Sequence, residues 1–527
     1  MMGVERIVVI GGGFGGVYAA RWLEKLLPPA EAGIHLVNRE NYFVFQPLLA
    51  EVISGSIGLL DTVAPIRRLC PRTRLYMREV ESIDLKRRVV TLAPGLRPRR
   101  LELEWDRLVI AAGTATDFSG MAGLSEHALP FRTLGDALRL RNRALEALEE
   151  ADHEQDAGFR RRLLTFVVAG GGFSGVEVVA ELNDFLRAAV RHFRGIRADE
   201  IRALLVHSGD RILPEMDAGL AGYAQKLLLG RGVELRLKAR VAKATQDAVV
   251  LNTGETIAAR TLVSTVPAGP VPLMQALDCR KEKGRLLVDA FLQLEGWQER
   301  VWALGDCAAI RMADGTAAPP TAQHAIREAR AVAENIRAAI RGRPQRPFQF
   351  AGLGKLGSLG HHSAVAEVFG VKFSGFPAWL LWRTIYLMKM PGLDRKVRVG
   401  LDWLTALVFP GELVQLRIRA TDNITSEHFE AGETIFEEGE VGDRLYVIRR
   451  GRVEVLRDGV CLNQLGAGEY FGEMALLANQ PRNATVRALE PTDVLAVAKG
   501  DFSKLLAGFP ELGAGLADLA SRRQGSH

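Results

Sequence analysis

The stretch Arg6-Ile-Val-Val-Ile-Gly-Gly-Gly-Phe-Gly-Gly16 decides the fold. It opens with branched apolar residues, as expected of a buried parallel strand, and residues 17–27 after it are typical of a helix. The pattern between them is G-x-G-x-x-G. Gly11 permits a tight turn, Gly13 lets a pyrophosphate approach the backbone, and Gly16 lets helix and strand pack closely. The helix N-terminus adds amide donors for the anion. We therefore predict a Rossmann-like α/β domain with a dinucleotide site; a glycine turn that serves packing alone is the alternative.

A second glycine fingerprint follows the buried-strand pattern Thr165–Ala169 and reads Gly170-Gly-Gly-Phe-Ser-Gly175. Two such units are far more specific than one, and they imply two dinucleotides, most economically a flavin and a nicotinamide. The matching second strand ends at His207, where NADH-specific sites usually carry a carboxylate and NADPH sites often carry an arginine. A neutral imidazole can donate to a ribose hydroxyl, and a protonated one could tolerate a phosphate. NADH and NADPH both stay open, as does a role for His207 as a strand cap only.

Glu177 lies two residues after Gly175, in the first turn of the predicted helix. A carboxylate there interacts favourably with the helix dipole, which would explain it without any function. It also disfavours a nearby pyrophosphate. We therefore expect Glu177 to act beside the nicotinamide or the electron acceptor.

Composition excludes several other classes of protein. The chain has 527 residues, 48% hydrophobic and 25% charged, which is typical of a soluble protein of three or four domains. Its net charge, 68 − 62 = +6, does not suggest a nucleic-acid binder. Its 4 cysteines are scattered without a CxxC, so we expect no disulfide framework, zinc site or dithiol centre. The longest uncharged stretch, Thr261–Leu277, contains three prolines and is too short to span a bilayer.

Three further motifs occur in a telling order: Leu108–Thr114 ends in Ala-Gly-Thr, Val301–Asp306 ends in Gly-Asp, and Pro319–Arg327 opens a helix. With the two fingerprints they resemble the two-dinucleotide flavoprotein reductases. Within that group, residues 1–416 resemble the type II NADH dehydrogenases, single-chain NADH:quinone oxidoreductases that pump no protons. The closer likeness lies in Asn41–Val52, Phe166–Glu177, Pro319–Arg330 and Gly357–Phe409.

The resemblance implies a role for each matching residue. FAD would be held by Gly11, Gly13, Phe14, Gly15, Gly16, Asn38, Arg39, Val80, Ala112, Gly113, Asp306, Ala322 and Gln323. NAD(P)H would be held by Gly170, Gly172, Phe173, Ser174, Gly175, Glu177 and His207. Catalysis would fall to Glu177 as a proton relay and to Gln323 and Arg327 at the acceptor.

Arg327 departs from the pattern of the family. Ala322 and Gln323 match the start of its A-Q-x-A-x-Q quinone motif, but the final glutamine is Arg327. Glutamine offers a neutral amide to a quinone carbonyl, whereas arginine is a permanent cation. Arg327 could stabilise the negative charge of a reduced quinone, or it could indicate a different acceptor.

The segment 376–410 gathers three of the seven tryptophans, Trp379, Trp382 and Trp403. Short apolar runs alternate there with Arg and Lys, and Trp prefers the headgroup level of a bilayer. We expect a helical pair that lies on a membrane without spanning it. A buried hairpin or a dimer interface is the alternative, and a homodimer is typical of the family.

From residue 424 short β-rich runs recur between glycines, as in a small jelly roll. The run Phe471–Thr485 resembles the phosphate cassette of cyclic-nucleotide-binding domains. By that resemblance Arg482 would hold the cyclic phosphate as a bidentate cation, and Glu473 would accept from the ribose hydroxyl. cAMP and cGMP both stay open. We expect no DNA-binding helix-turn-helix after this domain. The cassette residues are Phe471, Gly472, Glu473, Met474, Ala475, Arg482, Asn483 and Ala484.

The predicted architecture is α/β, with two Rossmann-like domains, an amphipathic helical segment and an all-β jelly roll. The expected division is 1–150 and 284–350 for FAD, 160–283 for NAD(P)H, 351–416 for membrane association or dimerisation, and 424–515 for the cyclic nucleotide. The leading hypothesis is an NAD(P)H:quinone oxidoreductase, peripheral on the cytoplasmic side of the inner (plasma) membrane and tuned by a cyclic nucleotide. A soluble reductase with a non-quinone acceptor and a cyclic-nucleotide-responsive signalling protein on a flavoprotein scaffold are the alternatives.

Overall fold

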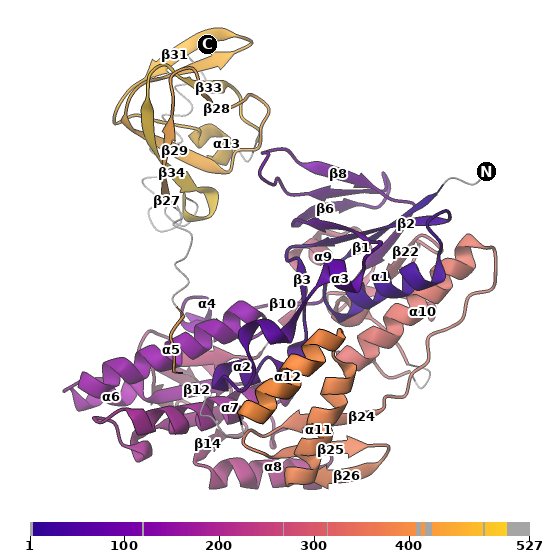
Figure 1. Cartoon of the computed structure of the whole chain (residues 1–527), viewed down its shortest axis with the longest axis vertical. Helices are drawn as coiled ribbons and strands as arrows, with labels where there is room; N and C mark the ends of the chain where they lie inside the picture. The colour runs from indigo at the N-terminus through magenta and orange to yellow at the C-terminus, as the bar shows by residue number, and fades with distance from the viewer. Residues whose placement is uncertain are drawn as a thin grey trace. The chain divides into compact units, whose positions relative to one another are not determined.

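The computed structural model describes residues 4–118, 121–266, 268–312, 315–406, 413–416, 424–477 and 480–502 (Figure 1). The chain forms two compact units. The first contains Met1–Met77, Asp84–Arg88 and Glu104–Leu416, and the second contains Arg78–Ile83, Val89–Leu103 and Arg417–His527. Residues 407–412 of the expected membrane segment, and residues 478–479 and 503–515 of the expected C-terminal domain, lie outside the described residues.

The first unit is built on two parallel five-stranded sheets, which confirms the Rossmann-like architecture. Ile7–Ile10 and Thr165–Ala169 are buried throughout, as a strand covered on both faces requires. Each of these strands leads through its glycine turn into a helix, α1 (Phe14–Leu26) or α7 (Phe173–Ala189). The first sheet has the order β22 (Val301–Ala303), β9 (Arg107–Ile110), β1 (Glu5–Ile10), β2 (Ala32–Asn38) and β5 (Arg74–Met77). The second has the order β11 (Ala128–Pro130), β18 (Thr261–Ser264), β12 (Thr165–Ala169), β13 (Arg202–Val206) and β14 (Val233–Arg236).

The chain passes from one sheet to the other earlier than expected. Strand β11 pairs with β18 of the second sheet, and α5 (Leu134–His153) packs into the core of that sheet. The predicted boundary at residue 150 therefore falls inside α5. The helix has a charged, exposed face and an apolar, buried face, and its overall composition alone does not reveal the buried one. A capping box of Thr133 and Asp136 begins the helix.

Helix α10 (Ala322–Ile340) returns to the first sheet and packs along α1, as Figure 1 shows. The first unit also contains the helices α6 (Ala157–Leu163) and α8 (Ala218–Gly230). The shorter elements of the first unit are β3 (Tyr42–Val44), α2 (Glu51–Ser54), β4 (Val63–Pro65), α3 (Ile66–Leu69), β10 (Ala115–Thr116), α4 (Leu124–His127), β15 (Val241–Ala244), β16 (Ala248–Leu251), β17 (Thr256–Ala258), β19 (Ala268–Gly269), α9 (Pro272–Ala276), β20 (Lys281–Glu282), β21 (Arg285–Leu287) and β23 (Ala308–Ala309), with 3-10 turns at Gln46–Leu48, Leu59–Thr62, Val190–His192, Ala198–Glu200 and Gly305–Cys307.

The segment expected to be helical from residue 351 begins instead with an antiparallel sheet of β24 (Gly354–Ser358), β25 (Ala364–Val368) and β26 (Val371–Ser374). Positive φ angles at Phe369 and Gly370 form the tight turn between the last two strands. Helices α11 (Gly375–Lys389) and α12 (Leu393–Thr405) follow, side by side in Figure 1. Among the described residues, no helix is long and apolar enough to cross a membrane.

The tryptophans of this segment are buried, so they do not supply the surface of the helical pair that would meet a membrane. Trp379, Trp382 and Trp403 are 7%, 1% and 6% exposed and pack inside the helical pair. Arg383 explains their burial, because its guanidinium lies 4.0 Å from the ring centre of Trp379 and 4.5 Å from that of Trp403. Aliphatic side chains and one phenylalanine occupy the outer faces: Phe376, Leu380, Met388, Leu393, Val397, Leu401 and Leu404.

The second unit contains the predicted jelly roll as two antiparallel four-stranded sheets. Aromatic and aliphatic side chains, among them Phe436, Tyr446 and Phe471, fill its core. One sheet has the order β27 (Ile424–Phe429), β34 (Thr492–Ala498), β29 (Arg444–Arg450) and β32 (Tyr470–Phe471); the other has β28 (Thr434–Phe436), β33 (Thr485–Ala488), β30 (Val453–Arg457) and β31 (Val460–Leu465). Helix α13 (Glu473–Leu477) follows β32. Most residues of the small sheet β6 (Val80–Asp84), β7 (Val89–Leu92) and β8 (Leu101–Glu104) also belong to this unit.

Candidate functional site

The first glycine turn has the shape that a pyrophosphate needs. Gly11 has a φ of +103°, and a Cβ on it would lie 2.2 Å from the carbonyl oxygen of Ala111. A Cβ on Gly16 would lie 1.8 Å from the Gly11 oxygen, so both positions exclude a side chain. A Cβ on Gly13 would meet no atom within 4 Å. The backbone at Gly13 is therefore open to a ligand.

Asn38 supports this turn. Its Oδ1 accepts a 2.9 Å hydrogen bond from the Gly12 amide, and its Nδ2 donates to the Glu40 carbonyl. Asn38, one of the residues expected to hold FAD, thus also holds the glycine loop from the end of β2. Arg39 follows it on the exposed side.

The second glycine turn repeats the arrangement. Gly170 has a φ of +117°, a Cβ on Gly175 would lie 1.7 Å from the Gly170 oxygen, and a Cβ on Gly172 would meet only Glu215, at 3.9 Å. Nδ1 of His207 accepts from the Gly171 amide at 3.2 Å, as Asn38 does in the first turn. Burial lowers the pKa of His207, which keeps the ring neutral. Because Nδ1 accepts, Nε2 carries the hydrogen, and no hydrogen-bond partner for it lies among the described residues.

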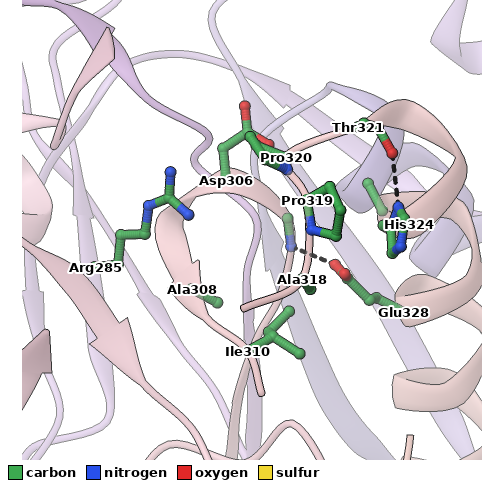
Figure 2. Close-up of a pocket in the computed structure, with 12 residues that line it drawn as sticks. Arg285, Asp306, Ala308, Ile310, Ala318, Pro319, Pro320, Thr321, His324 and Glu328 are labelled. Carbon is green, nitrogen blue, oxygen red and sulfur yellow. Dashed lines mark hydrogen bonds between the residues drawn. The ribbon is translucent and has the colours of Figure 1, made fainter. Parts of the chain in front are cut away.

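Asp306 lines two hollows of the first unit, one of which is drawn in Figure 2. It comes from the turn that follows β22. Gly113 and Thr114 line one hollow, and Arg285 lines both. Burial raises the pKa of the Asp306 carboxyl, while Arg132 and Arg285 act in the opposite direction. The predicted motifs at Gly113 and Asp306 are thus brought together around one carboxylate.

The sequence analysis missed Glu328 and Arg132. Oε2 of Glu328 accepts a 2.8 Å hydrogen bond from the Gly305 amide, drawn in Figure 2, and burial raises the pKa of Glu328 to about 7. Arg132 donates a 2.7 Å hydrogen bond to Thr114. Glu328 directly follows Arg327 in the quinone-like motif, and that adjacency was the available signal. Arg132 carried no local signal for the site, because its side chain meets Thr114 and Asp306 from other segments of the chain.

The amide of Gln323, at the start of α10, is engaged by the strand beside it. Its Nε2 donates to the Gly354 carbonyl at 3.1 Å, and its Oε1 accepts from the Leu353 amide at 3.2 Å. Arg327, four residues further along the helix, holds its guanidinium 4.8 Å from the ring centre of Phe350. Burial and Arg327 both lower the pKa of Lys389 on α11. Two cations thus lie close together beside the motif.

Glu177 reaches the other end of the same strand. Its Oε1 accepts a 3.1 Å hydrogen bond from the Ser358 amide. Burial raises the pKa of Glu177 to about 8, with a smaller contribution from Glu51. Burial and Glu177 together raise the pKa of Tyr386 on α11. Strand β24 therefore connects Gln323 on α10 with Glu177 on α7, two of the three predicted catalytic side chains.

The remaining predicted cofactor residues lie around these turns, with one exception. Phe14 is buried edge-on against Phe43, and Gly15 leaves room for Leu304. Phe173 packs beside Gly357, and Ser174 is exposed next to it at the start of α7. Ala112 adjoins Gly113, and Ala322 begins α10. The exception is Val80, which lies on β6 among the residues of the second unit.

The predicted cassette of the second unit is assembled around Arg482. Its Nη1 donates to the Gly472 carbonyl and its Nη2 to the Arg444 carbonyl, both at 2.8 Å, and its guanidinium lies 4.0 Å from the ring centre of Phe436. Glu473, 3% exposed, begins α13, and Ala475 and Ala484 are buried. Nδ2 of Asn483 donates to the Met474 sulfur at 3.5 Å. All eight predicted residues therefore belong to one turn and the segment that faces it.

Comparison with known proteins agrees with this geometry. Residues 5–329 match the family described as pyridine nucleotide-disulphide oxidoreductase, residues 353–410 match the NDH2 C-terminal domain, and residues 426–509 match the cyclic nucleotide-binding domain.

Two relatives and one solved structure illustrate the likeness. The chain is 31% identical over 415 residues to the type II NADH:quinone oxidoreductase Ndh of Mycobacterium tuberculosis, covering 76% of this chain and 87% of that protein. It is 33% identical over 411 residues to the demethylphylloquinone reductase NdbB of Synechocystis, covering 76% and 96%. The structure of NDH2 from Plasmodium falciparum in complex with NADH shares the fold, with a TM-score of 0.71, 18% identity, and coverage of 78% of this chain and 99% of that one.

Proposed function

The chain belongs to the pyridine nucleotide-disulphide oxidoreductase family, within it to the type II NADH:quinone oxidoreductases, and we propose that it reduces a membrane quinone under the influence of a cyclic nucleotide. Membership of this family makes it a flavoprotein enzyme that uses FAD and NADH. When bound, FAD supplies a two-electron carrier between nicotinamide and acceptor. The open backbone at Gly13 and Gly172 fits the diphosphates of the two cofactors. Asp306 would accept from the ribityl hydroxyls, and Nε2 of His207 would donate to the ribose of NADH.

The observation that carries the acceptor site is the shared strand β24. Gln323 holds Gly354 and Glu177 holds Ser358, and Arg327 and Lys389 lie beside them. In this arrangement an amide and two cations would face a quinone oxygen that becomes negative during reduction. Glu177 lies at the other end of the strand, and its pKa of about 8 keeps it protonated at neutral pH, so it would hold a proton for the acceptor.

A kinetic comparison of acceptors tests the assignment. The purified protein should be yellow and should oxidise NADH with a menaquinone or ubiquinone analogue embedded in liposomes. NADPH measured in parallel gives the cofactor preference. NADH oxidation that occurs only with soluble, non-quinone acceptors would reject the quinone assignment and favour the alternative to which the cation Arg327 points.

The outer faces of α11 and α12 support a peripheral position on the membrane. On α12 the exposed side chains Leu393, Val397, Leu401 and Leu404 are spaced as one helical stripe, with Arg398 exposed among them. Such a stripe with flanking cations suits insertion into the surface of an anionic bilayer. We place this face on the cytoplasmic side, where NADH is available. Cosedimentation with anionic vesicles tests it, with L401E the disruptive variant; a monomer–dimer shift without vesicle binding would assign the face to a homodimer instead.

Regulation by a cyclic nucleotide rests on the intact pair of Arg482 and Glu473. Burial lowers the pKa of Arg482, but an arginine stays charged at any pH of interest, and it adjoins the turn at Gly472. Isothermal titration with cAMP and with cGMP should show binding that R482A abolishes. Unaltered binding to R482A would contradict the assignment of the phosphate site. NADH:quinone turnover measured with and without each nucleotide then shows whether the binding domain changes catalysis.

A further inference from the structure

Three carboxyl side chains follow one face of α7. Glu177, Glu181 and Asp184 are four and three residues apart, which is the spacing of neighbours on a helix surface. Glu177 is partly exposed, Glu181 is only 7% exposed, and the side chain of Asp184 is 24% exposed. The most buried group therefore stands between two that keep some access to their surroundings.

One segment of chain runs beside this row and bonds to both of its ends. The Ser358 amide donates to Glu177 at 3.1 Å, and the His361 amide donates to Asp184 at 2.8 Å. A Cβ on Gly360 would lie 2.2 Å from Oδ2 of Asp184, so this close approach requires a glycine. The two outer carboxyl groups are thus held in position by neighbouring backbone amides.

Glu181, in the middle, faces α2 and α11. Ser54 hydrogen-bonds to it, and Glu51, which is 3% exposed, interacts with it electrostatically. Glu51 lies 3.8 Å from Arg383 and accepts from Trp403 at 2.6 Å. Burial raises the pKa of the Glu51 carboxyl, while Arg383 and the Trp403 indole act in the opposite direction and favour its charged form. Burial and the charge of Glu51 raise the pKa of Glu181 to about 8.

Other charged and titratable groups also surround the row. Burial raises the pKa of Asp184, while the His361 amide, Arg231, the His361 ring and Arg187 lower it. Tyr386 of α11 interacts electrostatically with Glu177, and burial and Glu177 both raise the pKa of its hydroxyl. Arg141 of α5 stacks on Phe185 of α7, with its guanidinium 5.2 Å from the ring centre, and donates to the Ile53 carbonyl.

We propose that Asp184 and Glu181 pass protons from solvent to Glu177 along the face of α7. The proposal rests on the quinone reductase function and identifies the proton supply of that site. Reducing a quinone to a quinol takes two electrons and two protons. NADH brings both electrons and one proton, so the second proton comes from solvent and the sum is NADH + H⁺ + quinone → NAD⁺ + quinol. That proton enters at Asp184, passes to Glu181 and then to Glu177, and leaves on the quinone oxygen. Glu181 acts through Glu177 and does not touch the acceptor.

The test compares E181Q, E181D and D184N with the wild-type holoenzyme. Reduction of the flavin by NADH alone, followed by stopped-flow absorbance, should be unchanged in all variants, because it needs no proton from this row. Turnover with a quinone analogue should fall at least about tenfold in E181Q, with a larger solvent isotope effect, and should recover in E181D. E234Q removes a carboxylate of the same domain that pairs with Arg202 at 2.8 Å, and it should leave both rates unchanged.

Infrared spectroscopy gives a readout independent of turnover. The carbonyl band of a protonated carboxyl group should be present in the wild-type protein at pH 7 and weaker in E181Q. Wild-type quinone turnover and pH dependence retained in E181Q would overturn the relay alone. Loss of flavin reduction together with quinone turnover, without rescue by E181D, would assign Glu181 a structural role and also overturn the relay. A wild-type enzyme that reduces no quinone would overturn the proposed function, and the relay with it.

Discussion

Trp403 donates its indole N–H to a carboxylate oxygen of Glu51 at 2.6 Å, although the two residues are 352 positions apart in the chain. Arg383 lies between the rings of Trp379 and Trp403 and 3.8 Å from the same carboxylate. The α11–α12 pair is thereby bonded to the N-terminal segment around α2. A buried carboxylate that loses such partners is costly, so these contacts tie the two segments firmly together.

Replacing Trp403 by phenylalanine should keep most of the ring packing but remove the donor to Glu51. We expect a loss of about 1–3 kcal/mol in the free energy of unfolding, because a buried acceptor is left with Arg383 alone. Thermal unfolding followed by circular dichroism measures the change. Leu404→Ala, one residue further on the exposed face of α12, is the matched control and should be within about 0.5 kcal/mol of the wild type. Equal melting temperatures for the two variants would show that the indole hydrogen bond contributes nothing.

Replacing Arg327 by glutamine should restore a neutral amide at the quinone site. The pKa of Lys389 should rise, since Arg327 now lowers it. The kcat/KM for acceptors that carry a negative charge should fall by about threefold, the size of effect expected when one partly exposed charge pair is lost. Arg330→Gln, which removes a cation paired with Glu334 on the exposed side of the same helix, serves as the control. An unchanged ratio between anionic and neutral quinones would contradict a selective role for Arg327.

Quinone reduction should depend on pH through Glu177. Its pKa of about 8 means that the side chain is protonated below that pH and ionised above it. A proton donor is therefore available at neutral pH, and the rate of the acceptor half-reaction should fall as pH rises through about 8. In Glu177→Gln this alkaline decline should vanish and the rate should be about 10²-fold lower throughout. Stopped-flow reoxidation by quinone between pH 6 and 9.5 measures both effects. A decline of the same shape in the variant would assign it to another group.

Glu181→Gln should stabilise the fold at alkaline pH. The pKa of Glu181 is about 8 in the folded protein, against 4.5 for an unperturbed glutamate, so between these two pH values the folded state binds more protons than the unfolded state. Stability from this group is complete below the unfolded pKa and is lost as pH rises through about 8. The variant avoids that loss. Its melting temperature should exceed that of the wild type at pH 9 by a few degrees, at about 2–4 °C per kcal/mol, and should match it near pH 5. A difference independent of pH would contradict the raised pKa.

The parts of the fold that follow local patterns could be predicted from the sequence. Strand, glycine turn and helix are adjacent in the chain. The turns at Gly11 and Gly170 can therefore be predicted from the local sequence alone. Glu51 and Arg132 could not be found in this way, because each acquires its surroundings from segments far away in the sequence.

For a related reason, the sequence left the burial of the tryptophans undecided. A count of aromatic and basic residues over 376–410 does not say which helix face turns inward, and Arg383 makes the inward face the aromatic one. The strands at 354–374 were not predicted, because the whole of 351–416 was expected to be helical.

Strand β24 sets the distance between the electron-accepting and the proton-donating sides of the site. Gln323 holds its first residue and Glu177 holds its last, and four steps of extended chain at about 3.3 Å each fix the interval between them at about 13 Å. Adding or removing one residue between Gly354 and Ser358 would change this interval and would also turn the following side chains to the opposite face. Related chains that use the same acceptor geometry should therefore vary in the composition of this strand but not in its length.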